Sequence, residues 1–237
     1  MDELWVCQLG TVDYREALTL QERVRSARRA GEVPDVMLVL EHPPVYTRGR
    51  RSGAGELPMG EDWYRAQGID IVDVDRGGKI TYHGPGQLVG YPIVRVDDVV
   101  AYLRTLEDAL AEALHQEGIA DARGRPEDGP DYTGVWVGDR KIASLGVHLA
   151  RGVTTHGWAV NVENDLEPFS WVVACGLPEV QMTSLIRETG RTEGVMRCFR
   201  KRAAYEVARA LGRRQRLVSL ARLEAAIGTL PALVPSA

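Results

Sequence analysis

Alternation between apolar and polar residues predicts several strands along the chain. Glu3–Leu9 is mostly apolar and Val36–Glu41 is a short continuous apolar run, so both are typical of buried strands. Between them a helix is expected to begin after Asp13, a favourable N-cap residue, and to end at Gly31. Later strands are predicted at Ile69–Asp75, Leu88–Val94 and Gly157–Val162, together with a hairpin formed by Val135–Val137 and Lys141–Leu149.

Apolar residues recur at helical spacing in three later segments. A long helix is expected to begin at Asp97 or Asp98 and to close at Gly118. A second helix, from Val195, ends at Gly212, and Leu220–Ile227 forms a short third one. Strands and helices that are interspersed irregularly favour an α+β fold over a strict βαβ alternation. We expect one domain over residues 1–237, with 230–237 as a frayed tail.

Composition limits the classes of function. The 237 residues are 44% hydrophobic, which fits one large globular domain. A net charge of −4 argues against bulk binding of nucleic acid. The N-terminal sequence MDELWVCQLG does not resemble a signal peptide, and no stretch approaches the ~18 apolar residues of a membrane span. Three widely spaced cysteines without a CxxC pair favour reduced thiols in a cytoplasmic protein.

The segment RGGKITYHGPGQ, residues 76–87, contains four glycines between two predicted strands. An ordinary hairpin turn requires only one or two glycines. The excess of bare backbone indicates a place where a ligand approaches main-chain N–H groups without side chains in the way.

Three cysteines are candidates for a nucleophile. Cys7 lies in an apolar strand and is expected to be a small buried hydrophobe, and Cys198 lies on a basic helix and is expected to be half exposed and structural. Cys175 lies at a bend in WVVACGLPEVQMTSL, because a glycine and a proline follow it. On position alone, Cys175 is the best of the three candidates.

Lys141 is the candidate base. A lysine at a turn is ordinarily solvated, but small residues at 143, 144 and 146 leave space for a ligand beside this one. A nucleophilic thiol needs a nearby base or cation, and lysine can serve as both. Arginine cannot accept the proton, and only three of the 29 basic residues are lysines: Lys79, Lys141 and Lys201.

The histidines do not have the spacing of a metal site. No pair shows the i, i+4 helical spacing or a CxxC companion that a zinc site requires. His83, inside the glycine segment, is expected to fix that loop or to face a ligand. No metal is therefore predicted, and no cofactor is predicted either.

Four segments together resemble the lipoyl(octanoyl) transferases: EHPPVYTRGR, RGGKITYHGPGQLVGYPIV, KIASLGVHLARGVTTHGWAVNV and ACGL followed by TSL. They occur in the family's order between about residue 5 and residue 186. The resemblance implies a fold like that of lipoate and biotin protein ligases, with a large mixed sheet flanked by helices. It also implies transfer of an octanoyl or lipoyl group from acyl carrier protein to a lysine of lipoyl domains. The implied acceptors are the lipoyl domains of 2-oxoacid dehydrogenases and the glycine cleavage H protein.

The same resemblance assigns residues. Cys175 matches the nucleophile that forms an acyl thioester, and Lys141 matches the lysine that activates it. Ala174 and Val160 depart from the family's usual proline and leucine, although neither change removes a functional group. The residues matching the substrate-binding segments are Arg76, Gly77, Gly78, Lys79, Ile80, Thr81, Tyr82, His83, Ser144, Leu145, Gly146, Gly157, Trp158 and Ala159.

Two other functions stay open at the level of sequence. A lipoate or biotin ligase carries a similar glycine segment and lysine, but it uses ATP and no covalent cysteine. A non-catalytic protein that binds an acyl chain or a carrier protein would not need Cys175 and Lys141 together. Arg48, Arg50 and Arg51 lie in the glycine-rich loop Thr47–Gly60, which is either a docking surface for an acidic carrier protein or simply solvated.

Overall fold

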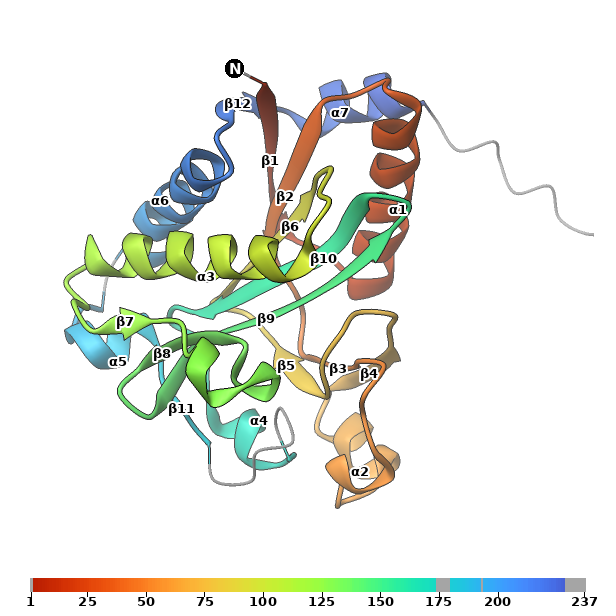
Figure 1. The fold of residues 1–237 in the computed structure, drawn as a ribbon. Coiled ribbons are helices and arrows are strands. Elements are labelled where there is room, and N and C mark those ends of the chain that lie inside the picture. Colours follow the sequence, from red (N-terminus) through yellow and green to blue (C-terminus); the bar gives the residue numbers. More distant parts are fainter. Residues whose placement is uncertain (1, 174–179, 193, 229–237) are drawn as a thin grey trace, which may run out of the picture.

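The computed structural model describes residues 2–173, 180–192 and 194–228 (Figure 1). The elements in chain order are β1 (Glu3–Thr11), α1 (Tyr14–Ala30), β2 (Asp35–Glu41), β3 (Val45–Arg48), η1 (Ala54–Glu56), α2 (Glu61–Ala66), β4 (Asp70–Asp73), β5 (Thr81–His83), β6 (Gln87–Ile93), α3 (Val99–His115), β7 (Ala122–Arg123), η2 (Pro126–Asp128), η3 (Pro130–Tyr132), β8 (Gly134–Val137), β9 (Arg140–Ala150), β10 (Val153–Asn161), α4 (Glu167–Ser170), β11 (Gln181–Met182), α5 (Leu185–Thr189), α6 (Val195–Ala210), β12 (Arg214–Val218) and α7 (Leu220–Ile227). None of the helices in these ranges is long and apolar enough to cross a bilayer.

The main sheet has mixed strand directions. Within the described ranges its order is β12-β1-β2-β6-β10-β9-β8-β7, and β11 pairs with β9. β1 runs parallel to β12 and β2, whereas the pairs from β2 through β6, β10 and β9 to β8 and β7 are antiparallel. The prediction of a mixed sheet flanked by helices is confirmed.

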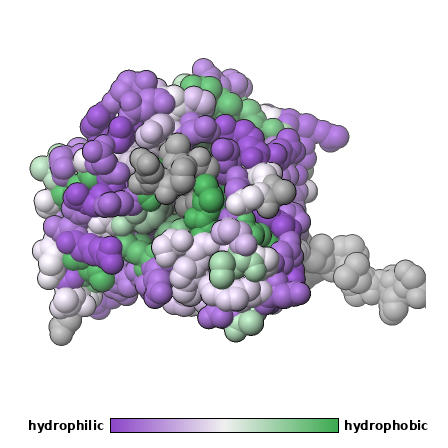
Figure 2. Space-filling view, turned by 90° about the horizontal axis from the view of Figure 1, so that it is seen from below, coloured by the Kyte–Doolittle hydropathy of each residue, from purple (hydrophilic) through white to green (hydrophobic). Residues whose placement is uncertain are grey.

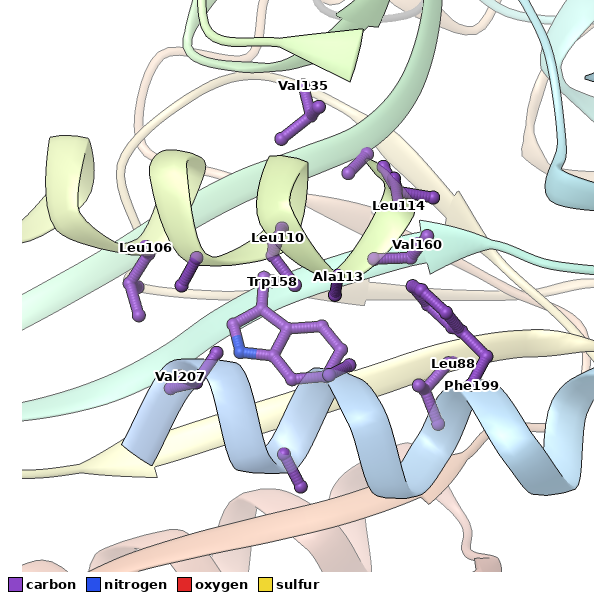
Figure 3. Packing of buried hydrophobic residues seen from close by; sticks show 14 of the residues in the cluster. Leu88, Leu106, Leu110, Ala113, Leu114, Val135, Trp158, Val160, Phe199 and Val207 are labelled. Carbon is purple, nitrogen blue, oxygen red and sulfur yellow. The ribbon is translucent and has the colours of Figure 1, made fainter. Parts of the chain in front are cut away.

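Alternate residues of the strands pack against helices on the two faces of this sheet. Leu4 and Val6 belong to the apolar cluster that includes α3 and α6, whereas Trp5 and Cys7 belong to the cluster that includes α1 and α7. Figure 3 shows Trp158 of β10 between the apolar residues of α3 and those of α6. A Cβ at Gly90 would lie 2.1 Å from the Trp158 ring, so this neighbouring strand must present bare backbone.

A second sheet, with the order β4-β3-β5, lies beside the main one. β5 falls inside the segment RGGKITYHGPGQ, which was expected to be a loop between strands. The expected loop Thr47–Gly60 also begins with the last two residues of β3. Both corrections have one cause: short strands of polar and aromatic residues gave no period-2 signal among the glycines.

The first boundary of α3 agrees with the prediction, whereas its last boundary does not. The Asp98 carboxylate accepts hydrogen bonds from the N–H groups of Val100 and Ala101, so the N-cap of α3 is confirmed. This helix ends at His115, three residues before Gly118. β12 was not predicted at all. The domain assignment stays a prediction, and its tail, 230–237, lies outside the described residues.

Candidate active site

A cavity of about 320 Å³ lies between β6, β9, β10 and the glycine segment. This volume is at the small end of the range usual for sites that bind small molecules. Seen from the side that bears α2 and α4, some apolar side chains lie near the middle of the face, with hydrophilic ones on several sides of them (Figure 2). The lining residues are Tyr14, Arg51, Arg76, Gly77, Gly78, Lys79, Thr81, His83, Val89, Tyr91, Val99, Leu103, Pro130, Asp131, Thr133, Lys141, Ser144, Leu145, Gly146, Val147, His156, Gly157, Trp158 and Ala159.

The fold brings most of the predicted substrate-binding residues to this cavity. From the three predicted segments, only Ile80 and Tyr82 do not line it. Both belong instead to the apolar cluster around the second sheet. Successive side chains of a strand point to opposite faces, so Thr81 and His83 face the cavity while Ile80 and Tyr82 face the other way.

The four glycines of the segment have different roles. Gly77 and Gly78 line the cavity, and the N–H of Gly77 donates to the Val147 carbonyl oxygen at 3.0 Å. A Cβ at Gly84 would lie 2.2 Å from the Tyr82 hydroxyl oxygen. Gly86 has a φ of +84°, and a Cβ there would lie 2.7 Å from the Asn164 backbone nitrogen. Ligand approach therefore explains at most two of the four, and close packing explains the others.

Arg76 connects the glycine segment to β3. Its guanidinium is buried and donates to the carbonyl oxygens of Gly77, Lys79 and Thr47, at 3.0, 2.8 and 2.7 Å. It also donates to the Thr47 hydroxyl at 2.7 Å. A charged donor bound to several carbonyls fixes a glycine-rich backbone that has few side chains of its own to hold it.

Lys141 is 1% exposed and lines the cavity, so it is not the solvated turn residue that its position alone would suggest. The preceding residue, Arg140, takes the exposed position and forms an ion pair with Glu188. The Lys141 Nζ lies 5.2 Å from the centroid of the Trp136 ring. A buried amine at the wall of a cavity can exchange a proton with a bound reactant.

Cys175 lies outside the described residues, but the chain on either side of it is placed. The N–H of Val173 donates to the Glu56 carbonyl oxygen at 3.2 Å, and the Glu56 carboxylate accepts from the N–H of Ile80 at 3.1 Å. On the other side, Met182 of β11 pairs with Lys141 of β9. The described residues that flank it are thus joined on one side, through Glu56, to the glycine segment and on the other side to the strand of Lys141.

The other two cysteines differ in burial. Cys7 is fully buried in β1, where burial raises the pKa of its thiol to about 11. It is therefore protonated at neutral pH, as the prediction of a small buried hydrophobe requires. Cys198 is exposed on α6, more so than expected. Within the described residues both thiols are free.

A cluster of tyrosine and histidine rings, which the sequence analysis did not predict, forms one wall of the cavity. Tyr14 stacks on His83 with ring centroids 5.7 Å apart, and Tyr91 also lines the cavity. His42 lies behind them, with Nδ1 donating to the Val12 carbonyl oxygen at 2.7 Å and Nε2 2.6 Å from the Tyr91 hydroxyl. Because the carbonyl accepts at Nδ1, neutral His42 accepts from Tyr91 at Nε2.

His156 is the other unpredicted residue of this wall. Its φ is +58°, which is uncommon for a residue other than glycine. Its Nε2 lies 2.8 Å from Oδ1 of Asp75, which also forms an ion pair with His148. The hydrogen bond from His156 holds the pKa of the Asp75 carboxyl well below its usual range. Asp75 directly precedes Arg76, so this pairing orients the start of the glycine segment.

The burial of His42 predicts that the protein is less stable in mild acid than at neutral pH. Burial lowers its pKa from 6.5 to about 4, so the folded protein takes up this proton less readily than the unfolded chain. The stability that neutral His42 contributes to the fold is fully present above pH 6.5. As the pH falls toward 4, the free energy of unfolding decreases by about 3 kcal/mol. Urea unfolding at pH 7 and pH 4 should show a smaller pH effect in His42→Gln by about this amount. Equal pH effects in both proteins would contradict the assignment.

The three arginines of the segment Thr47–Gly60 have different surroundings. Arg48 forms ion pairs with Asp73 and Glu61, and Arg51 forms one with Asp131 at 2.8 Å. Arg50 is exposed and has no ion-pair partner among the described residues. A docking role for this loop stays a prediction, and the ion pairs leave Arg50 as its most available cation.

The chain matches a known protein family over most of its length. Residues 13–203 match the model of the lipoyl protein ligase A/B catalytic domain. The chain belongs to this family. Within the described residues no group of three or more His, Cys, Asp or Glu side chains is arranged to hold a metal ion.

Curated relatives share nearly half of the aligned residues. The chain is 47% identical to an octanoyltransferase of Solibacter usitatus over 184 residues, covering 75% of this chain and 81% of that one. It is also 47% identical to an octanoyltransferase of Rubrobacter xylanophilus over 186 residues, covering 77% and 82%. The predicted resemblance to octanoyltransferases is confirmed.

Solved structures share the fold at lower identity. A lipoate-protein ligase A bound with ATP superposes with a TM-score of 0.76 at 19% identity, covering 95% of this chain and 92% of that one. A bipartite lipoate protein ligase from Thermoplasma acidophilum, studied with its E2 lipoyl domain, gives a TM-score of 0.71 at 17% identity, covering 96% and 90%. These similarities confirm the predicted ligase-like architecture.

Proposed function

We propose that this protein is an octanoyltransferase that moves an octanoyl group from acyl carrier protein to a lysine of a lipoyl domain. The observation that carries the proposal is the buried Lys141 amine at the wall of the cavity lined by the glycine segment and by small residues of β9 and β10. The relatives named octanoyltransferase support the same reaction. As acceptors we propose lipoyl domains of 2-oxoacid dehydrogenases and the glycine cleavage H protein, and as location the cytoplasm, where thiols stay reduced.

In the first half-reaction Lys141 takes the proton of the Cys175 thiol. The thiolate attacks the donor's thioester carbon, a new carbon–sulfur bond forms, and the bond to the carrier's sulfur breaks. The departing carrier thiolate takes the proton from Lys141. The enzyme is left as an octanoyl thioester at Cys175.

In the second half-reaction the acceptor lysine attacks this thioester as a neutral amine. An amide bond forms, the carbon–sulfur bond to Cys175 breaks, and Lys141 accepts the proton that the amine loses. Two placed contacts support a pairing of Cys175 with Lys141, namely the Val173 hydrogen bond to Glu56 and the β11 pairing of Met182 with Lys141. Gly78 also lines the cavity, where a preorganised N–H donor would stabilise the oxyanion of each step.

The test is incubation with octanoyl carrier protein in the absence of ATP, followed by intact mass measurement. We expect the protein to gain one octanoyl group, which an added lipoyl domain then removes. An ATP-dependent ligase would modify the lipoyl domain only with free acid and ATP. A protein that only binds acyl chains would show no covalent gain, and either result would contradict the proposal.

A further inference from the structure

Trp136 is placed to fix Lys141 although it does not touch the cavity. β8 and β9 form a hairpin in which Trp136 stands directly opposite Lys141, next to an irregularity of register between Val135 and Trp136. Side chains of directly opposed residues lie on the same face and contact each other. Lys141 lines the cavity, whereas Trp136 is 1% exposed and is not among the described residues that line it.

The Trp136 ring is itself held in place. Its indole N–H donates to the Tyr132 carbonyl oxygen at 2.8 Å, and the Tyr132 ring lies 5.3 Å away between centroids. The guanidinium of Arg125 lies 5.1 Å from the ring centroid, and Arg125 is paired with Asp128 and with Asp139. A ring fixed by a hydrogen bond and by packing presents its π system to Lys141 at one position.

Gly134 bounds the lysine on another side. A Cβ at Gly134 would lie 2.5 Å from the Lys141 Cε and 3.2 Å from its Nζ, so the lysine chain runs directly over bare backbone. The φ of Gly134 is +151°, a conformation that side-chain-bearing residues rarely adopt. The Gly134 N–H donates to the buried Glu107 carboxylate at 2.7 Å, which fixes the backbone at this point.

We propose that Trp136 is a positioning residue for the transfer reaction, holding the Lys141 amine by a cation–π contact against the backbone of Gly134. The distance of 5.2 Å between Nζ and the ring centroid lies within the range of this interaction. A base displaced by about 1 Å from its reactant can lose about a hundredfold in rate. The inference rests on the proposed function, because it gives Trp136 a role only through Lys141.

The test compares Trp136→Phe with Trp136→Leu, two apolar replacements of similar size of which only one keeps an aromatic face. We expect Trp136→Leu to lower kcat by about tenfold to a hundredfold with KM little changed, because the cavity wall is intact. Trp136→Phe should retain most of the activity. Equal kcat in the two variants, with equal thermal unfolding, would overturn the proposal.

A control variant and a double variant distinguish a positioning role of Trp136 from a role in folding. Trp5 of β1 has a similar cation–π contact, with Arg222 at 5.2 Å, and does not line the cavity, so Trp5→Leu should leave kcat unchanged. The rate of Cys175 alkylation, mapped by peptide mass spectrometry, should fall in Trp136→Leu but fall no further when this change is added to Lys141→Ala. The same loss in both backgrounds would make Trp136 purely structural. Wild-type activity in Lys141→Ala would instead refute the proposed function itself.

Discussion

Replacement of Cys175 by serine is expected to lower octanoyl transfer by more than about a thousandfold and to abolish the covalent octanoyl adduct. A hydroxyl is far less acidic than a thiol, so Lys141 cannot generate the nucleophile from serine at neutral pH. The measurement is initial rate with octanoyl carrier protein and a lipoyl domain, together with intact mass after the donor alone. The size of the effect reflects loss of the group that forms the intermediate, not loss of a contact.

The other two cysteines serve as controls, one on an exposed thiol and one on a buried thiol. Cys198→Ser changes an exposed thiol on α6 and should alter neither activity nor stability. Cys7→Ser places a hydroxyl in the buried strand β1, so stability should fall by about 1–3 kcal/mol while the folded fraction stays active. Mapping the adduct by peptide mass spectrometry decides between the three, and an octanoyl group on Cys7 or Cys198 would refute the assignment of Cys175.

The sequence predicted the elements in which apolar, buried positions are continuous or recur at regular spacing. β2 is buried almost throughout and α3 carries an apolar stripe, and both were found from pattern alone. β12 was missed because its sequence, RQRLV, is charged and mostly exposed at the edge of the sheet. This strand forms because its backbone pairs with β1, and no local sequence pattern predicts that contact.

The residues of the candidate site also fall into those that the sequence identified and those that it did not. Lys141 and the glycine segment could be identified because unusual residue types stand together in the sequence. Tyr14 and His156 lie 142 residues apart and meet only because α1 packs beside β10. The HPPVY segment was recognised as part of a family motif, but the hydrogen bond from Tyr91 to His42 depends on the pairing of β2 with β6. Residues joined only by tertiary structure were therefore the ones that sequence analysis missed.

Replacement of Lys141 is the second change with a large expected effect. Lys141→Met keeps an apolar chain of similar length against Trp136 and Gly134 but removes the amine. We expect kcat to fall by about 10²–10⁴-fold, the usual contribution of a positioned acid or base. Cys175 should also be alkylated more slowly at neutral pH, because its thiolate loses both its base and its counter-charge. Lys141→Ala should behave similarly, with an added loss of stability from the cavity it leaves.

Lys141→Arg separates charge from proton transfer. The guanidinium keeps a positive charge beside the thiol but cannot give up its proton near neutral pH. We therefore expect part of the thiolate stabilisation to survive in the pH dependence of Cys175 alkylation, while turnover is lost as in Lys141→Met. Because the lysine chain runs over Gly134 with no room for a Cβ, the larger guanidinium must also fit this space, so thermal unfolding is measured alongside. If Lys141→Arg turns over normally and all alkylation curves coincide with that of the wild type, Lys141 is not the base.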